Sequence, residues 1–267
     1  MMMDTSTTPS PRQNQLLGCL SERDYRRLLP FLELVPMPIG MTVSEAGKKM
    51  RHVYFPTTCI VSLINFLKDG SSAEYAITGN DGAVGVTLFL GGAPSPSWAI
   101  VLSSGYAYRI RADVIKKVFD DGGSLHQLLL RYMQSLFMQT GQVAVCNRYH
   151  SVEQQLCRRL LMSLDRLPSN ELAITQELIA HRMGVRREGI TEAAGNLQKA
   201  GLIQCSRGHI TVLDRRKLQA RACECYAAIK EDYDALFVRS VAEPAGRLSR
   251  FPARFIEARG CGSPAGL

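Results

Sequence analysis

The stretch that decides the fold runs from Ile174 to Leu197 and reads ITQELIAHRMGVRREGITEAAGNL. Its pattern predicts two short helices joined by a tight turn at Gly184. Ala180 is the small residue required where two helices cross closely, because a larger side chain there would clash. The apolar positions between the two helices are supplied by Ile179, Met183, Val185, Ile190 and Ala193.

The second of these helices begins with charged residues that point away from the apolar positions, namely Arg186, Arg187 and Glu188. In a helix-turn-helix motif, the N-terminal residues of the second helix meet base edges in the major groove of DNA. A helical hairpin with a glycine turn is by itself only a packing unit in most proteins. The combination of small residue, glycine, apolar spacing and basic helix start favours DNA binding.

The residues that follow predict a two-stranded hairpin. Residues 200–203 end the helix and begin a strand, residues 206–208 form a turn, and residues 209–213 pair back. A hairpin directly after a helix-turn-helix makes a winged helix.

Length and composition agree with such a protein. The chain has 267 residues, enough for about two domains, and its hydrophobic fraction of 46% allows each to bury a core. The net charge of +8 favours an anionic partner, with nucleic acid first and a membrane surface second, although a soluble basic protein is the alternative. The apolar runs are too short to cross a bilayer, and the polar N-terminus lacks a secretion signal, so we expect a cytoplasmic protein.

The region from residue 35 to residue 111 has a different pattern, with short β-rich runs separated by turn residues. The runs are HVYFP (52–56), CIVSLINFL (59–67), AEYAIT (73–78), AVGVTLFL (83–90) and WAIVLSSGYAYRIR (98–111). Short strands at this spacing predict an antiparallel sandwich or barrel-like roll. Alternating helices are missing from the pattern, so the fold class is α+β and not a parallel α/β sheet.

A long helix is predicted from residue 124 to residue 150, with a heptad-like apolar spacing. Its positions are Leu125, Leu129, Tyr132, Leu136, Gln139, Val143, Cys146 and His150. Such a seam packs one helix against another, so we expect a dimerisation helix in a homodimer. The alternative is a helix packed on its own domain.

These elements divide the chain into five parts. Residues 1–15 are a flexible tail, 16–121 a β-roll sensor domain, 122–150 a dimerisation helix, 151–235 a winged-helix DNA-binding domain, and 236–267 a disordered tail. The sensor domain opens with a short helix, for which Ser21 is the expected N-cap and Asp24 stands at the acidic position of a capping box.

The eight cysteines contain no C-x-x-C pair, so a zinc ribbon or ferredoxin-like site lacks its spacing. Cys223 and Cys225 form the closest pair, but on a helix they would point about 200° apart. We therefore expect reduced thiols and no metal site.

The order of parts resembles the Crp/Fnr transcription regulators over residues 16–235. The most specific portion is ELIAHRMGVRREGITEAAGNLQKAGLI, Glu177 to Ile203. The resemblance implies that the second helix is a recognition helix, and its base-contacting residues would be Arg186, Arg187, Glu188 and Glu192. Arg187 and Glu188 fall on the family's R-E pair, which suits guanine and cytosine respectively. Glu192 stands where some members carry another arginine, which puts the usual operator sequence in doubt.

The same resemblance places four further residues near DNA phosphates: Thr175, Gln176, Arg207 and His209. For Arg186 and Arg207, a solvated surface charge is the alternative.

The β-roll resembles a cyclic-nucleotide-binding fold, whose cAMP-binding members hold the phosphate with an arginine. Here no arginine lies between Arg51 and Arg109, and a buried phosphate without a cation would be costly. We therefore expect no cAMP and no other cofactor. A pocket for a different effector would be lined by Gly82, Gly85, Ser95 and Ser97; the alternative is that these residues only form turns. An iron–sulfur sensor is disfavoured because only Cys19 lies near the family's cysteine positions. Haem sensing would need a ligand such as His52, but a lone histidine is more often an ordinary surface or core residue.

The sequence thus predicts a homodimeric, sequence-specific regulator whose partner is double-stranded, palindromic DNA. RNA polymerase is a candidate further partner, and no membrane is expected. The alternative is a ligand sensor whose helical domain docks proteins and leaves DNA alone. Catalysis is not expected, because hydrolase, phosphate-loop and metalloprotease motifs are missing and Asp69, Glu74 and Asp81 are more simply solvated.

Overall fold

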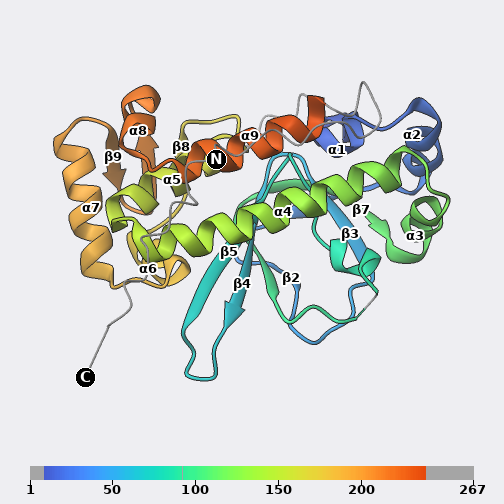
Figure 1. Ribbon diagram of the computed structural model, residues 1–267, viewed down its shortest axis with the longest axis horizontal. Coiled ribbons are helices and arrows are strands. Elements are labelled where there is room, and N and C mark those ends of the chain that lie inside the picture. The colour runs from blue at the N-terminus through green and yellow to red at the C-terminus, as the bar shows by residue number, and fades with distance from the viewer. Residues whose placement is uncertain (1–8, 92, 239–267) are drawn as a thin grey trace, which may run out of the picture.

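The computed structural model describes residues 9–91 and 93–238 (Figure 1). It confirms an α+β fold, with antiparallel sheets in the N-terminal region, one long helix and a helical C-terminal region that carries a small sheet. The N-terminal helical elements are η1 (Pro11–Gln13), α1 (Gln15–Gly18), α2 (Glu22–Leu28), η2 (Leu29–Phe31), η3 (Val86–Phe89) and α3 (Ala112–Asp120).

The β-roll consists of two antiparallel sheets with strand orders β1-β7-β3 and β2-β6-β4-β5. The strands are β1 (Glu33–Met37), β2 (Thr42–Ser44), β3 (His52–Pro56), β4 (Ile60–Phe66), β5 (Ser72–Thr78), β6 (Trp98–Ser103) and β7 (Gly105–Arg111). Their apolar side chains meet in the core, where Phe55, Ile60 and Ile110 are almost fully buried. Strand β3 coincides with the predicted HVYFP run.

One predicted strand of the roll is wrong. AVGVTLFL forms the single-turn helix η3, and only Val84 pairs with a strand, through backbone hydrogen bonds of 2.8 and 2.9 Å to Tyr54. Gly85 follows with a φ of 106°, a left-handed conformation that turns the chain out of the extended state.

The predicted flexible tail over residues 1–15 is wrong in its second half. Residues 1–8 lie outside the described residues, but Asn14 is fully buried, and its Nδ2 atom donates to the carbonyl oxygens of Pro56 and Gly82, each at 2.8 Å. These two hydrogen bonds fix the start of the chain on the roll. The capping prediction for Ser21 is confirmed, because its Oγ accepts from the backbone N–H of Asp24.

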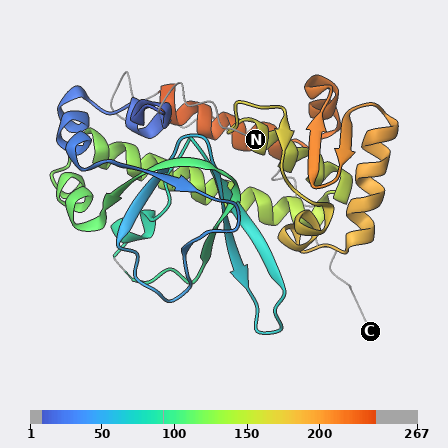
Figure 2. The same cartoon turned by 180° about the vertical axis from the view of Figure 1, so that it is seen from behind.

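Helix α4 (Ser124–Tyr149) crosses the molecule beside the roll, and α9 (Cys225–Val238) runs back along it in the opposite direction (Figures 1 and 2). The predicted tail from residue 236 therefore begins too early, since Leu236 is buried in α9; residues 239–267 lie outside the described residues. Within the described chain, no helix is long and apolar enough to cross a membrane.

The predicted dimer seam of α4 packs on its own chain. Leu125, Leu129, Tyr132 and Val143 are buried and Leu136 is partly buried, because α4 lies against β5 and α9. The Tyr132 hydroxyl is 3.0 Å from Thr78 Oγ1 and donates to the Ala83 carbonyl at 3.1 Å. The apolar spacing thus identified a packing face correctly, but the partner is intramolecular.

A different face of α4 is apolar and exposed. We call it the outer α4 face, and its residues are Leu130, Phe137, Met138, Val145 and Tyr149. Phe137 and Tyr149 are each 77% exposed, which is unusual for aromatic side chains on a helix that is otherwise half buried.

The C-terminal region contains α5 (Val152–Leu164), α6 (Gln176–Met183), α7 (Arg187–Lys199) and α8 (Arg215–Arg221). Its sheet has the order β8-β10-β9, formed by β8 (Glu171–Leu172), β9 (Ile203–Ser206) and β10 (His209–Val212).

Two buried ion pairs join this region to the roll: Arg159 to Glu74, and Arg166 to Asp81. The expectation that Glu74 and Asp81 are solvated is therefore wrong, because each carboxylate neutralises a buried guanidinium from the C-terminal region.

Candidate DNA-binding surface

The predicted helix-turn-helix is confirmed as α6 and α7. Thr175 caps α6, its Oγ1 accepting from the N–H of Leu178 at 3.1 Å. Gly184 ends the helix in the left-handed region, with φ 65° and ψ 32°, a conformation that costs a side-chain-bearing residue free energy. The N–H of Val185 then donates to the Ala180 carbonyl at 3.1 Å, and the buried Ala180 side chain permits this close crossing.

The four predicted base-contacting residues all lie on the exposed surface of α7, three of them at its start and Glu192 one turn further. Arg186 is the N-cap, and Arg187 and Glu188 occupy the first helical turn. An open hollow follows this outer face of the helix, lined by Arg187, Glu188, Thr191, Glu192, Gly195, Asn196 and Lys199. Sequence reasoning missed Thr191, Asn196 and Lys199. Steps of three or four residues lead from Glu188 to Thr191, and from Glu188 through Glu192 to Asn196 and Lys199, which places them all on one face of the helix.

The four predicted phosphate-contacting residues differ in whether their side chains already have hydrogen-bond or ion-pair partners within the chain. The Thr175 hydroxyl is used as a cap, and the Gln176 side-chain oxygen accepts from Thr191 at 3.1 Å, which ties the start of α6 to α7. Arg207 is exposed at the hairpin turn, where Gly208 adopts a φ of 76°. His209 Nδ1 lies 3.0 Å from a carboxylate oxygen of Glu171.

The hairpin of β9 and β10 pairs in register from His209 opposite Ser206 to Val212 opposite Ile203. Strand β8 adds to the other side of β10, so the wing is part of a three-stranded sheet. Its tip and the outer face of α7 both belong to the C-terminal region, which lies at one end of α4 in Figure 1.

The residues predicted for an effector pocket serve packing and turns in this structure. Gly82 lies so close to Tyr132 that an added methyl group would overlap the phenol ring, and Gly85 approaches the backbone of His52. The N–H of Ser97 donates to Ser95 Oγ at 3.2 Å within their shared loop.

Comparison with known proteins agrees with this geometry. Residues 154–221 match the family model for the Crp-like helix-turn-helix domain. The C-terminal region is a Crp-like helix-turn-helix domain. The matched residues run from the first turn of α5 to the end of α8 and so contain α6, α7 and the β9–β10 hairpin.

Solved structures extend the likeness to the fold of the chain. FixK2 from Bradyrhizobium japonicum aligns with a TM-score of 0.60 at 13% identity, covering 72% of this chain and 98% of that one. TTHB099, a CRP-family transcriptional regulator from Thermus thermophilus, aligns at 0.59 with 18% identity, covering 70% and 96%. The c-di-GMP-responsive global regulator CLP of Xanthomonas campestris aligns at 0.55 with 16% identity, covering 73% and 100%.

The resemblance to Crp/Fnr regulators is thus confirmed for the fold and for the C-terminal domain. A search of curated protein sequences gave no match. TTHB099 and CLP are both described as regulators.

Proposed function

We propose that the protein is a homodimeric transcription regulator that binds double-stranded DNA in a sequence-specific manner. The observation that carries this proposal is the exposed start of α7. Arg186, Arg187 and Glu188 are exposed, and among the described residues no side-chain hydrogen bond or ion pair holds them. A rigid helix therefore presents two guanidinium groups and a carboxylate that are free to meet base edges.

In the proposed complex, α7 enters the major groove. The Arg187 guanidinium would donate two hydrogen bonds to O6 and N7 of a guanine, and Glu188 would accept from N4 of a cytosine. Glu192 lies about one turn further along the same face. Its negative charge disfavours a phosphate or a guanine edge beside it. Arg207 at the tip of the wing would contact a phosphate, which positions the domain without reading sequence.

The dimer in this proposal forms through the outer α4 face. A second copy is the fitting occupant because a two-fold axis beside α4 would place two identical α7 helices for two half-sites, roughly 34 Å apart. Phe137 and Tyr149 would be its main apolar anchors, since aromatic side chains contribute most to such interfaces.

We further propose that the roll does not take cAMP. Two arginines of strand β7 already form ion pairs at the surface: Arg109 with Glu33 at 2.9 Å, and Arg111 with Asp113 at 2.8 Å. No arginine lies in the sequence between Arg51 and Arg109 to neutralise a buried cyclic phosphate. The protein would act in the cytoplasm, with RNA polymerase as a further partner.

Selection of bound fragments from random duplex DNA tests the proposal. The purified chain should enrich a palindromic motif whose half-sites are one helical turn apart, and binding should weaken steeply as salt is raised. If no fragment is enriched even in dilute salt, DNA binding is wrong. A single unrepeated half-site would contradict the dimer but retain the assignment of α7.

A further inference from the structure

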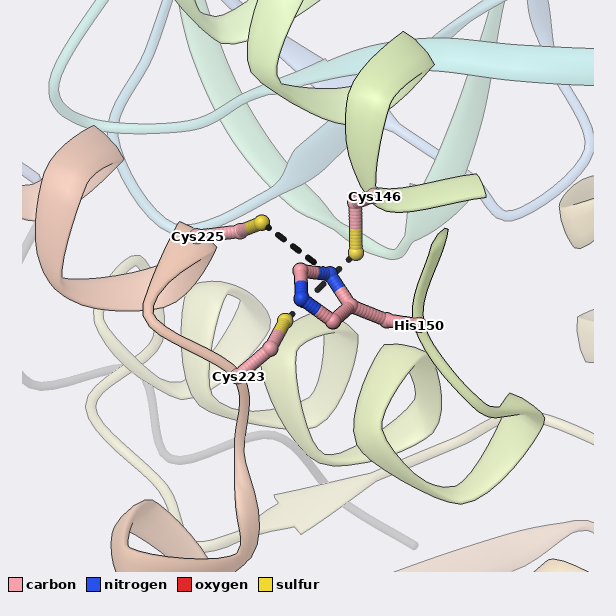
Figure 3. Close-up of side chains that lie close together, drawn as sticks. All are labelled: Cys146, His150, Cys223 and Cys225. Carbon is pink, nitrogen blue, oxygen red and sulfur yellow. Dashed lines mark hydrogen bonds between the residues drawn. The ribbon is translucent and has the colours of Figure 1, made fainter. Parts of the chain in front are cut away.

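Three cysteines and one histidine converge at the point where α4 ends and α9 begins (Figure 3). They are Cys146, His150, Cys223 and Cys225, and their potential ligand atoms all lie within 4.8 Å of one another. The three cysteines are buried and form a small cluster of their own, apart from the main hydrophobic core. Neither the DNA-binding surface nor the outer α4 face uses these residues.

The spacing of the sulfur and nitrogen atoms suits a single tetrahedral ion. Cys146 Sγ lies 3.5 Å from Cys223 Sγ, and Cys225 Sγ lies 3.4 Å from His150 Nδ1. A zinc ion binds sulfur at about 2.3 Å and nitrogen at about 2.0–2.1 Å, so the ligands of a tetrahedral site stand about 3.5–3.8 Å apart. Iron–sulfur clusters need more widely spaced cysteines, because several iron and sulfide ions must fit between them.

The backbone explains why the sequence pattern hid this cluster. Cys146 lies in the last turn of α4 and His150 is the C-cap of that helix, so the end of α4 supplies two of the four side chains. Cys223 is not helical, because α8 ends at Arg221 and α9 begins at Cys225. The expectation that Cys223 and Cys225 point apart on one helix is therefore wrong, and both sulfur atoms face His150 and Cys146.

The surroundings are those of a metal site. His150 Nε2 lies 3.3 Å from a carboxylate oxygen of Glu224, which fixes the ring so that Nδ1 faces the sulfur atoms. A carboxylate on the distal nitrogen is the usual support of a metal-binding histidine. Gln142 Nε2 also donates to Cys225 Sγ at 3.1 Å, a hydrogen bond that stabilises a thiolate.

A buried positive charge beside the cluster also fits a metal site. Arg158 is only 6% exposed, and within the described chain its Nε has no hydrogen-bond partner and no carboxylate forms an ion pair with it. The Arg158 side chain also lies within interaction range of Cys146. Three thiolates around a divalent ion carry one net negative charge, which this buried guanidinium would neutralise.

We propose that Cys146, His150, Cys223 and Cys225 bind one zinc ion as a closed structural site. On binding, the three thiols release their protons to solvent, and three sulfur–zinc bonds and one nitrogen–zinc bond form without any change of oxidation state. All four positions of the tetrahedron are filled by protein, so the site has no open position for a substrate.

The position of the ion in the chain gives it a structural role. The helix-turn-helix domain, residues 154–221, leaves the long helix after His150 and returns to it at Cys223. The ion would therefore join both ends of that domain to the end of α4 and hold α9 in place. This role rests on the proposed function. In the dimer, the zinc ion would fix the orientation of α7 relative to α4, the helix that carries the outer α4 face.

Metal loading of the purified full-length chain tests the site without any DNA. After chelation and reloading, one zinc ion per chain should remain through gel filtration, as measured by elemental analysis. Cobalt(II) in its place should give the intense visible bands of a tetrahedral ion and the near-ultraviolet absorption of thiolate-to-cobalt charge transfer. Zinc should also protect Cys146, Cys223 and Cys225 from alkylation, while Cys19 remains reactive.

Substitution separates this site from incidental binding. The double variant Cys223→Ser, Cys225→Ser should lose the bound zinc and the charge-transfer absorption, whereas Cys205→Ser, a half-buried cysteine in the wing, should retain both. Retention of stoichiometric metal by the double variant would overturn the proposal. So would a wild-type chain that takes up no metal, or one that carries a Cys146–Cys223 disulfide under reducing conditions. If the double variant does not fold, the cobalt spectrum and alkylation map of the wild-type chain decide.

Discussion

The guanidinium of Arg166 meets the carboxylate of Asp81, with Nη2 2.6 Å from Oδ2. The Arg166 side chain is 4% exposed, and it also donates from Nη1 to the Met162 carbonyl at 2.7 Å and lies over the ring of Tyr233. One buried charge from the C-terminal region is thus balanced by one carboxylate of the roll, beside the helix that returns from the DNA-binding domain.

Replacing Asp81 by asparagine should destabilise the protein strongly. The change leaves Arg166 buried without its counter-charge, so the free energy of unfolding should fall by about 3–5 kcal/mol in urea titrations. Asp113→Asn is the matched control, because it breaks a surface ion pair with Arg111 and should change stability little. Equal losses in the two variants would show that burial of the Arg166–Asp81 pair has no energetic consequence.

The sequence predicted those parts of the fold and site whose signals are local. Gly184 and the apolar spacing around it define α6 and α7, and alternating runs define most strands of the roll. The apolar spacing of α4 shows which residues pack but not what they pack against. It predicts a partner chain, whereas β5 and α9 of the same chain cover these residues.

Contacts between distant segments left no signal in a single sequence. Asp81 and Arg166 are 85 residues apart, and Cys146 and Cys223 are 77 residues apart. One continuous helix would point Cys223 and Cys225 apart, and only the break between Arg221 and Cys225 brings their sulfur atoms together.

Asp24 should make the stability of the protein sensitive to acid. Its Oδ2 accepts from the backbone N–H of Ser124 at 2.8 Å and of Leu125 at 3.3 Å, so it caps α4 from outside the helix. Burial alone would raise the pKa of this carboxyl, but hydrogen bonds from Ser124 and Leu125 hold it below its usual value. Because the folded pKa is lowered, the stabilisation is present at neutral pH and is lost as pH falls through that pKa.

Asp24→Asn should therefore lower the free energy of unfolding by about 1 kcal/mol at neutral pH and by less in acid, where the parent carboxyl is protonated as well. Urea unfolding at a series of pH values measures both. The Glu45→Gln variant, which changes a half-buried carboxylate whose only ion pair within the described chain is with the exposed Lys48, should follow the parent curve closely. A constant difference between Asp24→Asn and the parent across the series would exclude the carboxyl as the source of the pH dependence.

Phe137→Asp should convert the proposed dimer to a monomer. The substitution places a charge in the middle of the outer α4 face, where a second copy would otherwise bury the ring. Sedimentation velocity should show the loss of the dimer, while circular dichroism stays unchanged because Phe137 is 77% exposed in the single chain. Leu67→Asp makes the same kind of change at another exposed apolar residue, in the β4–β5 turn, and should leave the dimer intact. A Phe137→Asp protein that still sediments as a dimer would place the interface elsewhere.

Arg187→Ala and Arg207→Ala should weaken DNA binding in different ways. If Arg187 reads a guanine, its loss should cost about 1–3 kcal/mol on the preferred site and much less on sites altered at that base pair, so discrimination there is relaxed. If Arg207 contacts a phosphate, its loss should weaken binding to all sequences alike and reduce the salt slope by about one. Fluorescence anisotropy on matched and altered duplexes at several salt concentrations separates the two patterns.

The exposed Lys117 of α3 provides the control, since it carries the same charge but lies on the sensor domain, and Lys117→Ala should change neither discrimination nor salt slope. The comparison tests the orientation of the domain as well as its contacts, because α7 can read bases only if the wing tip reaches the backbone beside the same groove. If the Arg187→Ala protein discriminates between sites as well as the parent does, α7 does not lie in the major groove. The wing or another surface would then have to carry the binding.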